Sequence, residues 1–288
     1  MPSVDSLEEL DHAVAAFEVS NLALVIEPSA LAAARRSLDE SGLLLLGEVH
    51  GVRENPLVIR ALTQAFGLTA LALEWPDELG SVIAPYLAGE GLADHPALWL
   101  GDGRITAGHL AVLRERAAAS QLDLTLFDGV LSAGSSWSQR DEAMADCILT
   151  RAATADGKAS ADGKASADGK ATADGKASGL LVVAGNAHTP TQPTSLGVPL
   201  GACLARQRPG VRDIRISYGS GHFYNLRPRR FHPQPGMLGL HRQQIRLHLY
   251  RGSLILDLPQ PSEATVPHRD ANAGGQLGTG GQLGTGDS

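Results

Sequence analysis

Several features that define large protein classes are missing from this 288-residue sequence. It has two cysteines, Cys147 and Cys203, too few for the disulfide framework of a small secreted domain. No stretch reaches the roughly 18 consecutive apolar residues of a membrane-spanning helix. The acidic N-terminus lacks the basic head and apolar run of a signal peptide. We therefore expect a soluble protein of the reducing cytoplasm, without a membrane partner.

Aromatic residues and basic residues are also scarce. Phe, Trp and Tyr make up 4% of the sequence, and the formal charge is −7 with a pI near 5.8. This negative balance argues against a dedicated nucleic-acid binder. The hydrophobic content of 43% is enough for a sizeable core, and it excludes a wholly disordered chain, a coiled coil or a collagen.

Two low-complexity stretches interrupt the globular pattern. Residues 155–178 repeat the unit ADGKAS or ADGKAT four times, and the tail beyond residue 272 repeats GGQLGT. The first repeat has no large apolar side chain with which to offset the entropy lost on ordering. Calcium binding there is disfavoured, because each unit offers one carboxylate beside a repelling Lys. We predict one domain over residues 1–260, a disordered insert at 154–178 and a disordered tail at 261–288.

Apolar runs alternate with helical segments over the rest of the chain. The predicted strands are residues 42–47, 68–73, 122–127, 180–184 and 213–218. The predicted helices are residues 29–38, 55–66, 106–120 and 138–151. Two further strands, 245–250 and 253–258, flank Arg251 and Gly252 and predict an antiparallel hairpin that closes an edge. The pattern is typical of an α/β fold with a mainly parallel sheet covered by helices on both faces.

Ionisable residues follow the first four predicted strands. These residues are Glu48 and His50, Glu74, Asp128, and His188. Ligands of parallel α/β folds gather beyond the carboxyl ends of the strands, so these side chains are expected to share one rim. There a carboxylate could orient an imidazole and raise its basicity. Alternatively, His50, His188 and Glu74 could hold a divalent metal such as zinc or manganese.

Each residue also has an ordinary structural interpretation. His50 could cap the following helix, and Glu48 could pair with Arg53 or Arg60. Asp128 could make a turn before Gly129, and His188 could be a loop histidine. Four strands that end in such residues favour a shared site over coincidence.

The segment LLLLGEVHGVRENPLVIRALTQAFGLTALALEWPDE resembles the N-terminal signature of the erythromycin esterase, ChaN and TraB/Tiki superfamily. That superfamily has a G-E-x-H element after the first strand, a Glu after the second and a later G-x-x-H element. Here these elements are Glu48 and His50, Glu74, and the run from Gly185 through Asn186 to His188. The helix segment RDEAMADCI, which begins at Arg140, resembles the helix before that last strand.

The resemblance implies different activities in different branches. Esterase-like members are hydrolases that use His and Glu to activate water, and Tiki-like members are metal-dependent peptidases. ChaN-like members are associated with haem or iron uptake. A member recruited to a non-hydrolytic biosynthetic step is a further alternative.

Our leading hypothesis is a hydrolase acting on an ester or amide of a small molecule or peptide. His50 is the expected base for water, oriented by Glu48 or Glu74, and His188 the acid or oxyanion stabiliser. Asp128, Arg140 and Asn186 are expected to support them. No Gly-x-Ser-x-Gly element is present, which argues against a serine nucleophile. The competing class is a binding protein that holds haem or another ligand without turnover.

Residues 204–251 form a basic region in this acidic sequence. It holds ten arginines and one acid, Asp213, with Phe223, Tyr224, Phe231 and Tyr250 interleaved. The pattern fits a pocket wall for an anionic substrate or a solvated surface that balances the acidic half. A nucleic-acid face is the weaker interpretation.

Overall fold

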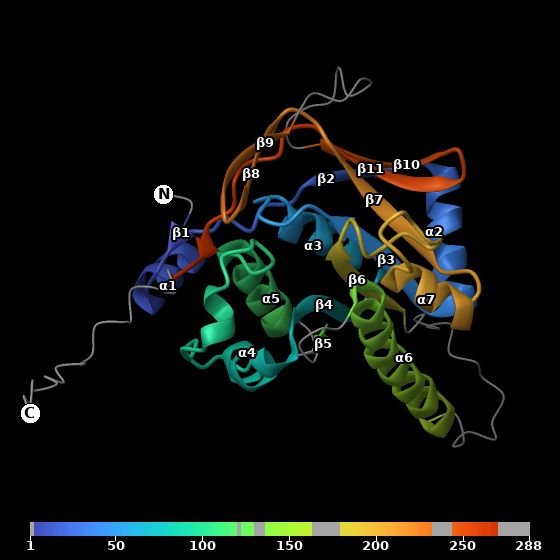
Figure 1. Ribbon diagram of the computed structural model, residues 1–288, viewed down its shortest axis with the longest axis horizontal. Coiled ribbons are helices and arrows are strands. Elements are labelled where there is room, and N and C mark those ends of the chain that lie inside the picture. Colours follow the sequence, from blue (N-terminus) through green and yellow to red (C-terminus); the bar gives the residue numbers. More distant parts are fainter. Residues whose placement is uncertain (1–2, 120–121, 130–135, 163–178, 232–243, 270–288) are drawn as a thin grey trace, which may run out of the picture.

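The computed structural model describes residues 3–119, 122–129, 136–162, 179–231 and 244–269 (Figure 1). Its central feature is an eight-stranded sheet with the order β2-β10-β11-β7-β3-β6-β4-β5. The strands are β2 (Ala23–Ile26), β3 (Leu43–Glu48), β4 (Ala70–Pro76), β5 (Asp123–Asp128), β6 (Leu180–Gly185), β7 (Arg212–Tyr218), β10 (Gln244–Tyr250) and β11 (Ser253–Leu258). Every neighbouring pair is parallel except β10 and β11, so the predicted fold class is confirmed.

Helices cover the sheet on both faces. They are α1 (Leu7–Ala15), α2 (Pro28–Ser41), α3 (Asn55–Phe66), α4 (Gly80–Leu87), α5 (Ala107–Ala119), α6 (Trp137–Asp162) and α7 (Leu200–Gln207). Strand β3 shows why: Leu44 and Leu46 enter one hydrophobic cluster while Leu43 and Leu45 enter another, and all four are fully buried. Such burial of both faces is typical of central parallel strands.

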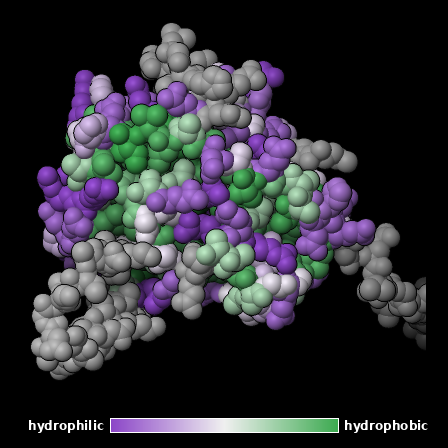
Figure 2. All heavy atoms as spheres, turned by 180° about the vertical axis from the view of Figure 1, so that it is seen from behind, coloured by the Kyte–Doolittle hydropathy of each residue, from purple (hydrophilic) through white to green (hydrophobic). Residues whose placement is uncertain are grey.

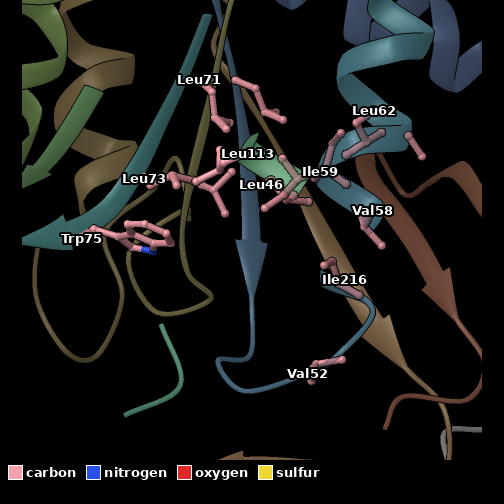
Figure 3. Packing of buried hydrophobic residues seen from close by; sticks show 14 of the residues in the cluster. Leu46, Val52, Val58, Ile59, Leu62, Leu71, Leu73, Trp75, Leu113 and Ile216 are labelled. Carbon is pink, nitrogen blue, oxygen red and sulfur yellow. The ribbon is translucent and has the colours of Figure 1, made fainter. Parts of the chain in front are cut away.

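The two clusters lie on opposite faces of the sheet, and different helices contribute residues to each. Figure 3 shows the larger one, where Leu46 lies beside Leu113 of α5 and Ile59 of α3. The smaller one contains Ile148 of α6 and Leu204 of α7. Replacing Ile59 with Ala would lower the free energy of unfolding by about 2–5 kcal/mol, because the packed surroundings cannot collapse fully into the cavity that is left.

The hairpin β10–β11 is confirmed, with Arg251 and Gly252 at positive φ in its turn. Its predicted place at an edge of the sheet is wrong. Strand β10 also pairs with β2 in parallel, and β11 pairs with β7, so β2 is the edge strand on this side. The four residues of β2 are all apolar, and they alternate between exposed and partly buried.

Two small sheets complete the architecture. Strand β1 (Ser3–Val4) pairs with β12 (Val266–Pro267), and β8 (Gly221–Asn225) forms an antiparallel hairpin with β9 (Arg227–Phe231). Residues 261–269, which the sequence assigned to the tail, therefore contribute to the folded part, and Ala264 and Val266 are buried. Residues 270–288 lie outside the described residues.

The predicted insert is described only in part. Helix α6 runs to Asp162 and so includes the first residues of the 154–178 segment, whereas 163–178 lie outside the described residues.

Within the described ranges, no helix is both long enough and apolar enough to cross a bilayer. On the face shown in Figure 2, apolar residues gather in patches that are bordered by hydrophilic ones.

Candidate active site

The four residues expected to form the site come together at one edge of the sheet. Strand β6 lies between β3 and β4, and Glu48 is in register with Gly185. The parallel register places the carboxyl ends of all three strands side by side, so Glu48, Glu74 and His188 reach the same rim. The register of β4 shifts against β5 between Leu73 and Pro76, the segment that contains Glu74.

His50 is held by Glu48, two residues before it. Its Nδ1 atom lies 3.2 Å from Glu48 Oε1, and Glu48 is 4% exposed. The backbone between them is fixed by Tyr218 of β7, whose hydroxyl accepts the Val49 N–H at 2.9 Å and donates to Asn55 Oδ1 at 3.0 Å. The sequence did not point to Tyr218, because the contact joins residues 169 positions apart.

Opposing effects act on the pKa of His50. Burial lowers it, but the hydrogen bond with Glu48 and the charges of Glu74, Glu48 and Asp102 raise it, and the net result is a pKa above its ordinary value. With Nδ1 engaged by Glu48, Nε2 is the ring nitrogen available for proton transfer. A Cβ added at Gly185 would lie 3.1 Å from this Nε2 and 3.6 Å from Glu74 Oε2, so both atoms border the same glycine.

Glu74 is the central carboxylate. Its Oε2 accepts the Gly185 N–H at 2.8 Å, and its Oε1 accepts from Arg140 Nη2 at 2.9 Å. Burial by itself would raise the pKa of Glu74, but His50, His188, the Gly185 N–H and Arg140 lower it below the ordinary value. Glu74 is therefore ionised at neutral pH between the two histidines.

His188 has its own carboxylate, Asp141. Its Nδ1 lies 2.7 Å from Asp141 Oδ1, while its Nε2 lies 3.6 Å from Glu74 Oε1. Trp137 stacks on the imidazole with ring centroids 5.1 Å apart and planes inclined by 18°. Both Trp137 and Asp141 are on the first turns of α6, which therefore fixes the ring in orientation and in plane.

Two arginines surround the carboxylates of the rim. Arg140 donates to Asp128 Oδ1 at 3.0 Å and to Glu74, and Arg104 contacts Asp128 and Asp102. Burial opposes but does not overcome these arginines, which hold the pKa of Asp128 below its usual range. Asp128 is thus the ion-pair partner of Arg140.

Asn186 and three residues that the sequence did not indicate complete the surroundings of the rim. Asn186 contributes its backbone N–H to the Glu48 carbonyl at 2.8 Å, so its support is to the turn. Asp141, Trp137 and Arg104 were missed. Asp141 directly follows Arg140 in the predicted helix 138–151, so its position was within reach of the sequence. Arg104 lies in a loop, where no sequence pattern indicates it.

A cavity of about 10 Å³ lies beneath the rim. Its lining includes Glu48, His50, Glu74, Arg104 and His109. His109 of α5 is buried, and desolvation together with the charge of His50 lowers its pKa, so its imidazole is neutral at neutral pH. The space suits about one water molecule.

The residues at this rim do not fit a metal ion. The guanidinium of Arg140 lies 2.9 Å from Glu74 Oε1 and 3.4 Å from His188 Nε2, which places a cation among the predicted ligands. Among the described residues, no group of three or more His, Cys, Asp or Glu side chains has the arrangement of a metal site. The cavity beside His50 has room for a water molecule but not for haem.

Comparisons with known proteins add the following. No family model and no curated protein matches the sequence. A Bacillus cereus protein of known structure is 11% identical, with a TM-score of 0.47 over 91% of this chain and 100% of the other. A succinoglycan biosynthesis protein is 13% identical, with a TM-score of 0.47 over 90% of this chain and 98% of the other. At these values the similarity assigns neither a family nor a function to the chain.

Proposed function

We propose that this protein is a hydrolase that uses two histidines for acid–base catalysis without a metal ion. One observation carries the proposal: two imidazoles, each bound by its own carboxylate, flank a third, buried carboxylate at the carboxyl edge of a parallel sheet. The pairs are His50 with Glu48 and His188 with Asp141, and the shared carboxylate is Glu74.

Paired histidines of this kind suit the two proton transfers of hydrolysis. Neutral His50 takes a proton from water at Nε2, and the water oxygen forms a bond to the carbonyl carbon of the substrate. Collapse of the tetrahedral intermediate breaks the bond to the leaving group. His188 stabilises the developing oxyanion or supplies the leaving group with a proton from Nε2.

The surrounding charges support this division of roles. Glu48 and Glu74 stabilise the imidazolium that forms on His50, which raises its pKa. Arg140 keeps Glu74 ionised and lies 3.4 Å from His188 Nε2, where it favours negative charge on the reacting oxygen. An ester or amide of a small molecule or peptide is the substrate class that matches this chemistry and the resemblance noted in the sequence.

Hydrolysis of para-nitrophenyl acetate provides the test. We expect His50→Ala and His188→Ala each to lose about 100-fold or more of the rate while remaining folded. His12→Ala is the matched control, because His12 is an exposed histidine on α1, and it should retain full activity. An active His50→Ala enzyme would remove this residue from the mechanism. Tight binding of a ligand without turnover would favour the alternative of a binding protein.

A further inference from the structure

The β8–β9 hairpin contacts Gly51, the residue that follows His50. After His50, the Tyr224 N–H donates to the Gly51 carbonyl at 2.9 Å, and a Cβ at Gly51 would overlap the Tyr224 carbonyl oxygen. The turn of the hairpin is attached to the loop that carries Arg104, since the Leu226 N–H donates to the Gly101 carbonyl at 3.0 Å. The hairpin is therefore attached to the two loops that carry His50 and Arg104.

An aromatic stack joins the other end of the hairpin to the residue before His50. Phe231 of β9 stacks on Tyr218 with ring centroids 4.6 Å apart, and Phe223 of β8 packs on Phe231 at 4.5 Å. Tyr218 in turn binds the Val49 N–H. The position of the hairpin and that of His50 are thus set by the same residues.

The second strand of this hairpin has an unusual concentration of positive charge. Arg227, Arg229 and Arg230 are all exposed, and none of them is ion-paired or hydrogen-bonded within the part of the chain that the structure describes. Register places Arg229 opposite Phe223, so these two side chains share a face. Arg227, two residues before Arg229, lies on that same face, which also carries Phe231.

Other arginines of the basic region are engaged locally. Arg246 pairs with Asp257 at 3.0 Å, Arg212 donates to the Gly252 carbonyl at 3.2 Å, and Arg206 donates to Cys203 Sγ at 3.2 Å. In a chain of formal charge −7, three exposed guanidinium groups that have no ion pair among the described residues therefore create a local positive field on this hairpin.

We propose that the β8–β9 hairpin is a subsite for an anionic group of the substrate, a carboxylate or a phosphate, with Arg227 and Arg229 as its ligands. This inference rests on the proposed function, and it names the substrate class: a molecule with an anionic group apart from the bond that is cleaved. Arginine suits this task, because its planar guanidinium binds either oxyanion through two parallel hydrogen bonds. The aromatic face beside the arginines provides an apolar contact for the adjoining part of the substrate.

Binding of inorganic phosphate and of succinate, measured by calorimetry at low ionic strength, tests the subsite independently of catalysis. Wild-type protein and His50→Ala should bind at least one of these anions. The double variant R227Q/R229Q should bind it about tenfold or more weakly. R35Q/R36Q is the matched control, because Arg35 and Arg36 are exposed neighbours on α2 and the charge change is identical. It should bind the anion as the wild type does.

Kinetics with an anionic ester, mono-para-nitrophenyl succinate, and the neutral para-nitrophenyl acetate supply the second measurement. R227Q/R229Q should raise the KM for the anionic ester about tenfold relative to that for the neutral one. The subsite is overturned if wild type binds neither anion, or if both double variants lose binding equally. Tight binding of a DNA duplex that is lost only in R227Q/R229Q would overturn it in favour of a nucleic-acid face. Absence of activity on both esters would count against the proposed function alone, because the calorimetry still decides the subsite.

Discussion

The Asp141 carboxylate holds His188 and the start of α7 at the same time. One oxygen lies 2.7 Å from His188 Nδ1, and the other accepts the Leu200 N–H at 2.7 Å. Because the second oxygen accepts the Leu200 N–H, the carboxylate of Asp141 has little freedom to rotate. The side chain therefore orients the His188 ring, with the Nδ1–H donating to Asp141 and Nε2 facing Glu74.

Asp141→Asn should abolish hydrolysis while preserving the fold. The Leu200 N–H keeps the amide oxygen, which turns the amide N–H₂ toward His188 Nδ1. Nδ1 then has no acceptor, so the ring can no longer donate from Nδ1 and Nε2 together, as the proposed role of Nε2 requires. We expect a loss of about 100-fold or more in kcat on the ester substrate. Asp146→Asn, at an exposed position of the same helix, is the control and should be fully active. A near-wild-type rate for Asp141→Asn would show that the hydrogen bond between His188 Nδ1 and Asp141 has no part in catalysis.

The acidic limb of the pH–rate profile should report His50. As the pH falls, His50 is protonated and can no longer act as a base, so kcat/KM declines. Because the pKa of His50 is raised, the midpoint should lie above the ordinary histidine value of about 6.5. Glu48→Gln removes a hydrogen-bonded charge that raises this pKa and should move the midpoint to lower pH. NMR titration of the His50 ring is the independent check, and an unshifted midpoint in Glu48→Gln contradicts the assignment.

Asp128 should contribute stability that depends on pH. Its folded-state pKa is lowered, so its contribution is present above the unfolded pKa and is lost as the pH falls through the folded value. At neutral pH, Asp128→Asn should lower the free energy of unfolding by about 2 kcal/mol, since two partly buried arginines lose a charged acceptor. The difference between variant and wild type should shrink toward a pH of about 3, as measured by urea unfolding. A constant difference at both pH values would mean that the charge of Asp128 is not what stabilises the fold.

Gly51→Ala and Gly67→Ala form a matched pair. Both glycines have positive φ, 76° and 67°, so alanine is strained at either position. A Cβ at Gly67 meets nothing within 4 Å, whereas at Gly51 it would overlap Tyr224. Gly67→Ala should cost about 1 kcal/mol of unfolding free energy. Gly51→Ala should cost clearly more and also reduce activity, because it displaces the residue next to His50. If Gly51→Ala and Gly67→Ala had equal effects on stability and activity, the β8–β9 hairpin would be shown to move aside at little energetic cost.

Much of this architecture can be predicted from the sequence, and the reasons are local. Helix α3 begins and ends where Pro56 and Gly67 indicate, because Pro is tolerated in the first turn and Gly adopts the left-handed cap. The rim residues were found because parallel strands align their carboxyl ends. Asp141, Tyr218 and Arg104 were missed because their importance lies in contacts between distant segments, which local patterns do not encode.

The strand order also constrains how the molecule is assembled. Ala23 at the start of β2 pairs with Gln244 of β10, and β10 reaches β7 only through β11. Glu74 likewise needs the Gly185 N–H, and Val49 needs the Tyr218 hydroxyl. Forming such non-local pairs costs loop-closure entropy before the new contacts stabilise the chain, and this slows folding. During synthesis, Glu74 and Val49 acquire these partners late, and β2 has no strand to pair with in the main sheet until β10 has left the ribosome.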